Sequence, residues 1–463
     1  MAVLRRYFRL EHGVLVAVAM VAIALKLTLT SGHLLPGYDE AYYWVQVRSL
    51  LTNGRLAFDD LPLVFWVQSL LAVLMGDIPL AVRISDALLP ALAAVPVWVL
   101  YHDGHKKNWY VFPVLLMAVL LHPIQLYYFT GDFIKNASAV PLAMLLGWWL
   151  TQHTAESNWR TVLGTAVTCI VIALTHFGVL LLCVSIVAVW LCAHALRDSP
   201  RLLVIRLGSL ILLATLFVLL LLIFVPERFA RLIGIFGDVS LLFTNPLGLL
   251  MYFGIPRVTR PDIVFACIAG QLGAVLLGLC AWRNRAHLSD NVRAVVSAFV
   301  LTAFVFSSPL LSIEIALRLT ALSFVPLLLA AMVLWLRTTD ITTQAVVCVL
   351  LLSTLVVSAV IYPRGATPPV LRQSEWQDFQ VMVNTVIIEQ PALVVAPHGI
   401  NFLVAWYLNT HVAGEDVAVI DSTQQYRAHY VLAIRGSSAK TAQTNPRGSI
   451  VYENDTFTLS RTK

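Results

Sequence analysis

Charged residues are scarce in this chain. Only 12% of its 463 residues are Asp, Glu, Lys or Arg, whereas 59% are hydrophobic. A soluble globular domain usually contains about 25% charged residues. The shortage excludes a soluble protein and predicts a polytopic membrane protein. Lys and Arg produce a formal net charge of +6, but they lie in short loops, which favours membrane topology over nucleic-acid binding.

Cysteine is also rare, and its positions suggest no chemistry. The six cysteines lie in or at the ends of apolar segments, without the spacing of a metal site or a disulfide framework. We interpret them as packing residues. The sequence also lacks internal repeats. Because inverted repeats are typical of many secondary transporters, their absence from the sequence disfavours that class.

Long apolar runs dominate the sequence instead. A membrane-spanning helix needs about 20 apolar residues, and the runs in this chain predict about eleven such spans. The predicted spans are 13–31, 79–101, 109–126, 137–151, 161–176, 177–196, 203–225, 262–282, 294–309, 316–336 and 342–362.

The basic residues orient these spans. The loops that alternate along the predicted bundle carry clusters of Lys and Arg, which the positive-inside rule assigns to the cytoplasm. These residues are Arg5, Arg6, Arg9, Lys106, Lys107, Arg160, Arg197, Arg201, Arg206, Arg283, Arg285, Arg293 and Arg337. We therefore predict a cytoplasmic N-terminus and an extracytoplasmic C-terminal region, in a bacterial or archaeal plasma membrane.

The fold class predicted is mainly α, with a small C-terminal α/β soluble domain. Residues 1–363 would form the transmembrane domain, whose first outer loop, 32–78, carries amphipathic helices. Residues 364–463 would form a soluble extracytoplasmic domain of about 100 residues. The expected elements outside the membrane are helices at 39–52, 62–75, 375–390 and 399–410, strands at 392–396, 416–420 and 429–435, and a second outer loop at 226–260.

Two adjacent carboxylates, Asp39 and Glu40, follow the first span. Ionisable groups close to hydrocarbon are costly to desolvate and often functional. Adjacent residues of a helix point about 100° apart, so one of the two can face a site while the other pairs elsewhere. A simple helix cap by Asp39 would also explain its position. The two explanations are compatible, because a capping carboxylate can still accept a proton.

Further candidates lie at the outer ends of the spans. Asp132 and Lys135 could shape a site for an acceptor and an anionic headgroup, or they could form an i, i+3 pair. Arg318 suits bidentate phosphate binding, although an ion pair with Glu314 at i, i+4 would explain it equally well.

Three more ionisable residues have simpler explanations. His176 ends the predicted span 161–176 and could contribute to a site, but a lone histidine between helices is more often a packing residue. Lys26 is expected to extend to the outer interface, and Arg83 to pair with Asp86 at a helix end or extend in the same way.

Together these features resemble the GT-C superfamily of polytopic glycosyltransferases, in particular the branch of protein O-mannosyltransferases and aminoarabinose transferases. The segments that carry the resemblance are Tyr38-Asp39-Glu40-Ala41-Tyr42-Tyr43-Trp44, residues 80–88, Gly131-Asp132-Phe133-Ile134-Lys135-Asn136-Ala137 and residues 318–328. The chain lacks the Asp-X-Asp and Trp-Trp-Asp signatures of oligosaccharyltransferases, which disfavours transfer of a whole glycan to asparagine.

The resemblance implies an enzyme that moves a sugar from a polyprenyl-phosphate donor to a lipid, glycan or protein acceptor, with inversion at C1. Asp39 would activate the acceptor or bind a metal, with Glu40 beside it and Asp132 as second acid. Arg318 and Lys135 would bind the donor phosphate, and Tyr42 and His176 would contribute to the site.

Several alternatives stay open. The carboxylates of Asp39 and Asp132 are compatible with a divalent metal, Mg²⁺ or Mn²⁺, and equally with catalysis without one. Within enzymes, the alternative is an oligosaccharyltransferase that uses a diphosphate-linked glycan. Outside enzymes, it is a non-catalytic transporter of lipid-linked glycans or an assembly subunit. A nucleic-acid partner is not expected.

Overall fold

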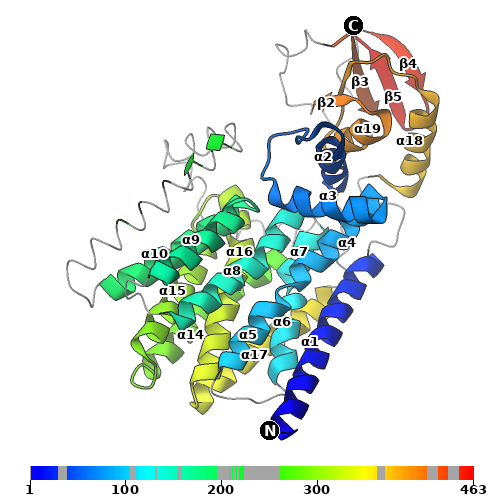
Figure 1. Ribbon diagram of the computed structural model, residues 1–463. Coiled ribbons are helices and arrows are strands. Elements are labelled where there is room, and N and C mark those ends of the chain that lie inside the picture. The colour runs from blue at the N-terminus through cyan, green and yellow to red at the C-terminus, as the bar shows by residue number, and fades with distance from the viewer. Residues whose placement is uncertain are drawn as a thin grey trace.

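The computed structural model describes residues 2–29, 39–104, 111–130, 133–153, 159–195, 261–361, 371–413, 426–435 and 448–462, together with isolated residues between 208 and 223. The described chain forms a bundle of apolar helices that is covered at one end by two shorter helices (Figure 1). A C-terminal region, which comprises residues 371–413, 426–435 and 448–462, lies beyond these two helices. The N-terminus lies at the opposite end of the bundle (Figure 1).

The bundle confirms a polytopic membrane protein. Its helices are α1 (Ala2–Leu29), α4 (Ile78–Ala91), α5 (Ala94–Asp103), α6 (Val111–Leu120), α7 (Pro123–Thr130), α8 (Ile134–Gln152), α9 (Trp159–Ala173), α10 (Phe177–Ala195), α14 (Pro261–Arg283), α15 (Asp290–Phe306), α16 (Ile313–Arg337) and α17 (Ile341–Ile361). Seven described segments are long and apolar enough to cross a membrane. Helices occupy every predicted span except 203–225, of which only isolated residues are described.

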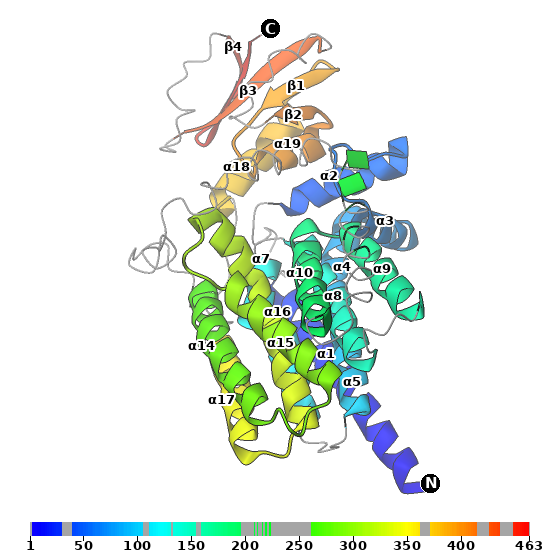
Figure 2. The ribbon, with the colours of Figure 1, turned by 90° about the vertical axis from the view of Figure 1, so that its left-hand side faces the viewer.

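Helix α16 lies at the centre of this bundle and α1 at its edge. Of the residues in the apolar stretch of α16, 94% are buried, whereas only 17% of those in the apolar stretch of α1 are buried. The view turned by 90° shows α16 between α14 and the helices α8 and α10 (Figure 2). The exposed apolar side chains of α1 therefore suit contact with lipid.

Two of the predicted spans are broken, where we expected continuous helices. The span 79–101 divides into α4 and α5 just after Pro90, and the span 109–126 divides into α6 and α7 just before Pro123. Proline cannot donate a backbone hydrogen bond, and its ring clashes with the preceding turn. At the second break, the hydroxyl of Ser358 from α17 donates to the carbonyl of Leu121 at 2.6 Å. A neighbouring helix thus satisfies a backbone group that the break has freed.

The two predicted helices of the first outer loop are present as α2 (Glu40–Asn53) and α3 (Leu63–Met75). Each ends at a glycine in the left-handed conformation, Gly54 and Gly76. Helix α3 is 13 residues long, too short to span a bilayer, and it lies across the end of the bundle (Figure 1). Its exposed side chains include Trp66, Leu70, Val73 and Leu74.

The C-terminal region contains a five-stranded sheet in the order β2-β1-β3-β5-β4. The strands are β1 (Ala392–Val395), β2 (His411–Ala413), β3 (Ala428–Ile434), β4 (Ser449–Glu453) and β5 (Phe457–Arg461), and the helices are α18 (Gln373–Thr385) and α19 (Asn401–Leu408). Strand β1 is parallel to β2 and β3, whereas β5 is antiparallel to β3 and β4. The α/β character predicted for this region is confirmed.

The individual C-terminal predictions had mixed outcomes. Helices α18 and α19 and strands β1 and β3 lie where they were predicted, although α18 ends earlier. Strands β2, β4 and β5 were not predicted. The predicted strand 416–420, the loop 226–260 and the proposed boundary at 363/364 lie outside the described residues.

Candidate active site

Asp39 stands at the N-terminal boundary of α2, but it does not act as the expected helix cap. Helix α2 begins at Glu40, as predicted, yet the Asp39 side chain accepts no hydrogen bond from the backbone of the first turn. A cap therefore does not explain this carboxylate. Asp39 interacts electrostatically with Tyr43, one turn further along α2.

Glu40 has a different role from its neighbour. Its carboxylate is buried and accepts a hydrogen bond from Nε of Arg83 in α4 at 3.1 Å. Arg83 was expected to pair with Asp86 or to extend to the interface, and its pair with Glu40 corrects that interpretation. Burial raises the pKa of the Glu40 carboxyl to about 8, although the charge of Arg83 acts in the opposite direction.

A second buried pair of opposite charges lies behind the first. Lys26 of α1 and Asp86 of α4 attract each other electrostatically, and the ammonium of Lys26 lies 5.5 Å from the ring centroid of Phe129. Lys26 is only 3% exposed, so the expected extension toward the interface was wrong. Arg83 and Asp86, both in α4, thus link Glu40 of α2 to Lys26 of α1.

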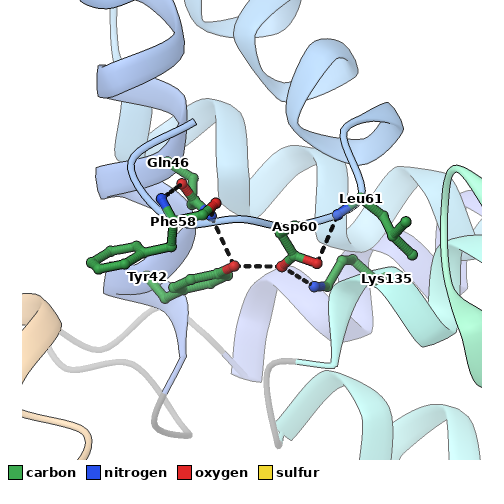
Figure 3. Close-up of polar contacts among 6 residues, drawn as sticks. All are labelled: Tyr42, Gln46, Phe58, Asp60, Leu61 and Lys135. Carbon is green, nitrogen blue, oxygen red and sulfur yellow. Dashed lines mark hydrogen bonds and ion pairs between the residues drawn. The ribbon is translucent and has the colours of Figure 1, made fainter. Parts of the chain in front are cut away.

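Asp60 is the centre of the densest polar network in this area (Figure 3). It lies in the loop between α2 and α3 and is 2% exposed. Its Oδ2 accepts hydrogen bonds from the hydroxyl of Tyr42 and from the ammonium of Lys135, and its Oδ1 accepts the backbone N–H of Leu61 at 2.8 Å. Three segments distant in sequence therefore meet at one buried carboxylate.

Gln46 attaches this loop to α2. Its Nε2 donates to the hydroxyl of Tyr42 at 2.8 Å and to the carbonyl of Phe58 at 2.9 Å, while its Oε1 accepts the N–H of Phe58 at 3.0 Å. Gln46 is fully buried, and buried amides that are satisfied in this way fix their partners firmly. The position of Asp60 relative to Tyr42 is consequently held from two sides (Figure 3).

Tyr43 lies within electrostatic range of the carboxylates of both Asp39 and Asp60. Burial raises the pKa of its hydroxyl well above the usual range, and the nearby charges of Asp39 and Asp60 raise it further. The ammonium of Lys135 lies 5.8 Å and 5.7 Å from the ring centroids of Tyr42 and Phe65, which suits a cation–π contact. One cation, two carboxylates and two tyrosines thus gather at the end of the bundle that α2 and α3 cover (Figure 1).

The comparison with known proteins rests on structure. No protein-family model matches the chain, and no curated protein matches it. The oligosaccharyltransferase of Archaeoglobus fulgidus in the apo form superposes with a TM-score of 0.53 at 13% identity, over 87% of this chain and 64% of that chain. The oligosaccharyltransferase AglB of the same organism, in complex with an inhibitory peptide and a dolichol-phosphate, gives a TM-score of 0.50 at 12% identity, over 86% of this chain and 64% of that chain. The chain has the GT-C fold.

ArnT of Cupriavidus metallidurans in the apo state gives a lower TM-score of 0.46 at 14% identity, over 98% of both chains. The GT-C chain described here spans about 64% of the length of the oligosaccharyltransferases that it matches. At this level of identity the likeness establishes the fold, while the chemistry depends on the residues of this chain.

Some predicted site residues lie in this part of the GT-C fold, and others do not. Tyr42 and Lys135 contact Asp60 directly, Asp39 acts electrostatically on Tyr43, and Glu40 pairs with Arg83 of α4. Asp132 lies outside the described residues, so its predicted pair with Lys135 stays a prediction. Within the described residues, no group of three or more His, Cys, Asp or Glu side chains could hold a metal ion.

The other two candidates, His176 just before α10 and Arg318 in α16, lie in different parts of the bundle. The Nδ1 of His176 accepts the N–H of Val179 at 3.3 Å, which caps the first turn of α10. This contact favours the packing interpretation of His176. Arg318 is exposed near the start of α16. The side chain of its expected partner Glu314 lies outside the described structure, so that pair stays a prediction.

Asp60 was not among the predicted site residues. A signal was present, because Asp59 and Asp60 directly precede Leu61, Pro62 and the apolar helix α3 in the first outer loop. A carboxylate that enters an apolar segment needs a partner, for the same reason that drew attention to Asp39. The identity of the partner, Lys135, becomes apparent only in the folded GT-C chain.

Proposed function

We propose that this chain is an integral-membrane glycosyltransferase that moves a sugar from a polyprenyl-phosphate donor to an acceptor on the extracytoplasmic face. The observation that carries the proposal is the position of Asp39. This carboxylate stands at the start of α2, where it and Asp60, the partner of Lys135, both act electrostatically on Tyr43, in a chain with the GT-C fold. The AglB complex with a dolichol-phosphate supports a lipid-phosphate donor.

In the proposed reaction, an acceptor hydroxyl attacks C1 of the sugar as Asp39 takes its proton. The bond from C1 to the phosphate oxygen breaks, and its electron pair leaves with the polyprenyl phosphate. Attack opposite the leaving group inverts the configuration at C1. A positioned general base of this kind contributes about 10²- to 10⁴-fold to the rate.

Lys135 and Arg318 are the proposed cations for the donor phosphate. Lys135 already donates to Asp60, but an ammonium has three hydrogens and can donate to a phosphate as well. Arg318 is exposed at the outer part of α16 and can form a bidentate pair with phosphate. Positive charge near the leaving phosphate stabilises it as the bond breaks.

Asp60 is proposed to position Lys135 and Tyr42 rather than to accept a proton. Its two oxygens already accept three hydrogen bonds, so they are occupied by partners within the protein. The same bonds disfavour Asp60 as a metal ligand. A divalent cation such as Mg²⁺ or Mn²⁺ would therefore be held by Asp39 and Asp132, where it would polarise the donor phosphate. The A. fulgidus oligosaccharyltransferase in complex with Zn and sulfate supports this option.

The test compares wild type with Asp39→Asn in membranes of expressing cells. Sugar transfer and the pool of lipid-linked sugars would be followed together by mass spectrometry. At equal protein levels, we expect the variant to lose about 10²-fold or more of the transfer rate and its lipid-linked donor to accumulate. A matched control is Asp59→Asn, because Asp59 is an exposed carboxylate of the same outer loop.

The accumulated species identifies the donor. A monosaccharide on a polyprenyl phosphate supports the proposal, whereas a diphosphate-linked oligosaccharide supports the oligosaccharyltransferase alternative. If Asp39→Asn transfers sugar at the wild-type rate, Asp39 is not the base. If membranes with the wild-type chain transfer no more sugar than membranes without it, a non-catalytic transporter or assembly subunit becomes the better explanation.

A further inference from the structure

The C-terminal region contacts α2 through one short helix, α19. Figure 1 shows α19 lying against α2 at the junction between the C-terminal region and the outer end of the bundle. Along α2, Tyr42 belongs to the Asp60 network, whereas Arg48 lies two turns further on. Helix α2 therefore meets both the proposed site and the C-terminal region.

Arg48 caps the end of α19. Its two terminal nitrogens donate to the carbonyls of Ala405 at 2.8 Å and Trp406 at 2.7 Å, and its guanidinium lies 4.7 Å from the ring centroid of Trp406. The last carbonyls of a helix have no partner within it, and its C-terminal end is electrically negative. An arginine that satisfies two such carbonyls and stacks on a ring therefore fixes both the place and the direction of α19.

Phe402, one turn before Trp406, extends the contact to the site. Its ring centroid lies 5.0 Å from that of Tyr42 and 5.7 Å from that of Phe58, in edge-to-face arrangements. The ring centroids of Trp406 and Trp44 lie 5.6 Å apart, with the rings tilted relative to each other. Tyr42 and Phe58 are the residues that Gln46 holds next to Asp60, so the ring of Phe402 completes the enclosure of that network.

We propose that Phe402 and Arg48 are positioning residues: docking of α19 on α2 keeps the hydroxyl of Tyr42 on Asp60. The inference rests on the proposed glycosyltransferase function. Without the ring of Phe402, Tyr42 loses an aromatic neighbour on the side of the C-terminal region and gains room to rotate. The hydroxyl then leaves Asp60, and Lys135 and the loop around Phe58 shift with it. Small displacements of this kind can reduce a rate by up to about 10²-fold.

Helix α19 presents different aromatic rings to α2 and to the rest of the C-terminal region. Its buried residues Leu403 and Val404 belong to a hydrophobic cluster that includes residues both of α2 and of the sheet. Tyr407, also on α19, contacts Trp376 and Phe379 of α18 instead of α2. Substitutions at 402 and 407 thus remove aromatic rings of similar size from two different faces of one helix.

The test measures sugar transfer and amide hydrogen exchange in Phe402→Ala, with Tyr407→Ala as the matched control. In Phe402→Ala we expect kcat to fall between about 10- and 100-fold with a smaller change in KM. We also expect faster exchange of the Phe58 and Leu61 amides, which are bonded to Gln46 and Asp60. Tyr407→Ala should leave both quantities near the wild-type values, and Phe402→Leu should restore most of kcat.

Arg48→Lys provides a second, independent variant. Lysine keeps the charge but cannot donate to both carbonyls from one planar group, so it should show the same pattern more weakly. Equal effects of Phe402→Ala and Tyr407→Ala, or normal exchange at Phe58 and Leu61 in Phe402→Ala, would overturn the positioning role. A wild-type protein that transfers no sugar overturns the proposed function instead, and the exchange data would then report only whether α19 holds the loop.

Discussion

Lys135 and Asp60 form a buried ion pair across 75 positions of the sequence. The pair connects the first turn of α8 to the loop between α2 and α3, and so attaches the first outer loop to the bundle (Figure 3). Because neither side chain is well solvated, each depends on the other for compensation of its charge.

The first prediction concerns this pair. Removing one partner leaves an uncompensated buried charge, so Asp60→Asn or Lys135→Met should each lower the free energy of unfolding by about 3–5 kcal/mol. The loss in Lys135→Met should lie at the lower end of this range, because Tyr42 and Leu61 still donate hydrogen bonds to Asp60. Thermal unfolding in detergent would measure both.

The double variant supplies the control. Asp60→Asn combined with Lys135→Met should be less destabilised than the sum of the single variants by about 0.5–3 kcal/mol. Strictly additive effects would mean that the two charges do not interact in the folded protein.

The second prediction concerns pH. The pKa of Glu40 is about 8 in the folded chain against an ordinary value of 4.5, so between these values the folded state binds more protons than the unfolded state. The stability due to Glu40 is therefore fully present below pH 4.5 and is lost as pH rises through about 8. Melting temperatures of wild type and Glu40→Gln across this range would measure the effect. The variant should show a weaker loss of stability with rising pH, and parallel curves would contradict the prediction.

The third prediction concerns the break between α6 and α7. Ser358→Ala removes a hydroxyl that lies 2.6 Å from the carbonyl of Leu121 and 2.8 Å from that of Thr354, and it should cost about 0.5–1.5 kcal/mol, the net contribution of a typical hydrogen bond. Ser353→Ala in the same helix is the control, since Ser353 donates only within α17. Similar melting temperatures for the two variants would show that the Ser358 contact adds no stability.

The fourth prediction concerns Arg318. If this side chain binds the donor phosphate, Arg318→Gln should raise KM for the lipid-linked donor by about 10- to 100-fold, which is the loss of one or two charge-assisted hydrogen bonds. Arg285→Gln is a suitable control, because Arg285 stacks on Trp282 at the opposite end of α14 from the proposed site. An unchanged KM would remove Arg318 from the donor site.

The sequence was sufficient to predict most of the described helices, but not the buried network around Asp60. Apolar runs predict bundle helices well, because burial in lipid requires them to be long and continuous. The carboxylates of Asp39 and Glu40 were visible for the same reason. Their separate roles were expected from helix geometry, and the pair of Glu40 with Arg83 bears this out.

The remaining features depend on contacts that sequence patterns do not encode. Asp60 became important only because Lys135 approaches it from α8. Strand β4 was missed because most of its residues are exposed on both faces, so it lacks the alternation that marks a half-buried strand. Strand β2 has three residues, too few to show any period.

Helix α3 has a consequence for the depth of the reaction. It carries no charged residue, presents Trp66, Leu70 and Val73 outward, and begins three residues after Asp60. Exposed Trp and aliphatic side chains on a helix too short to span suit the boundary between headgroups and acyl chains, so we expect α3 to link the height of the Asp60 network to the surface of the bilayer. Bilayers of different thickness would move α3 against the bundle. We therefore expect the rate of sugar transfer to vary with the acyl-chain length of the surrounding lipid.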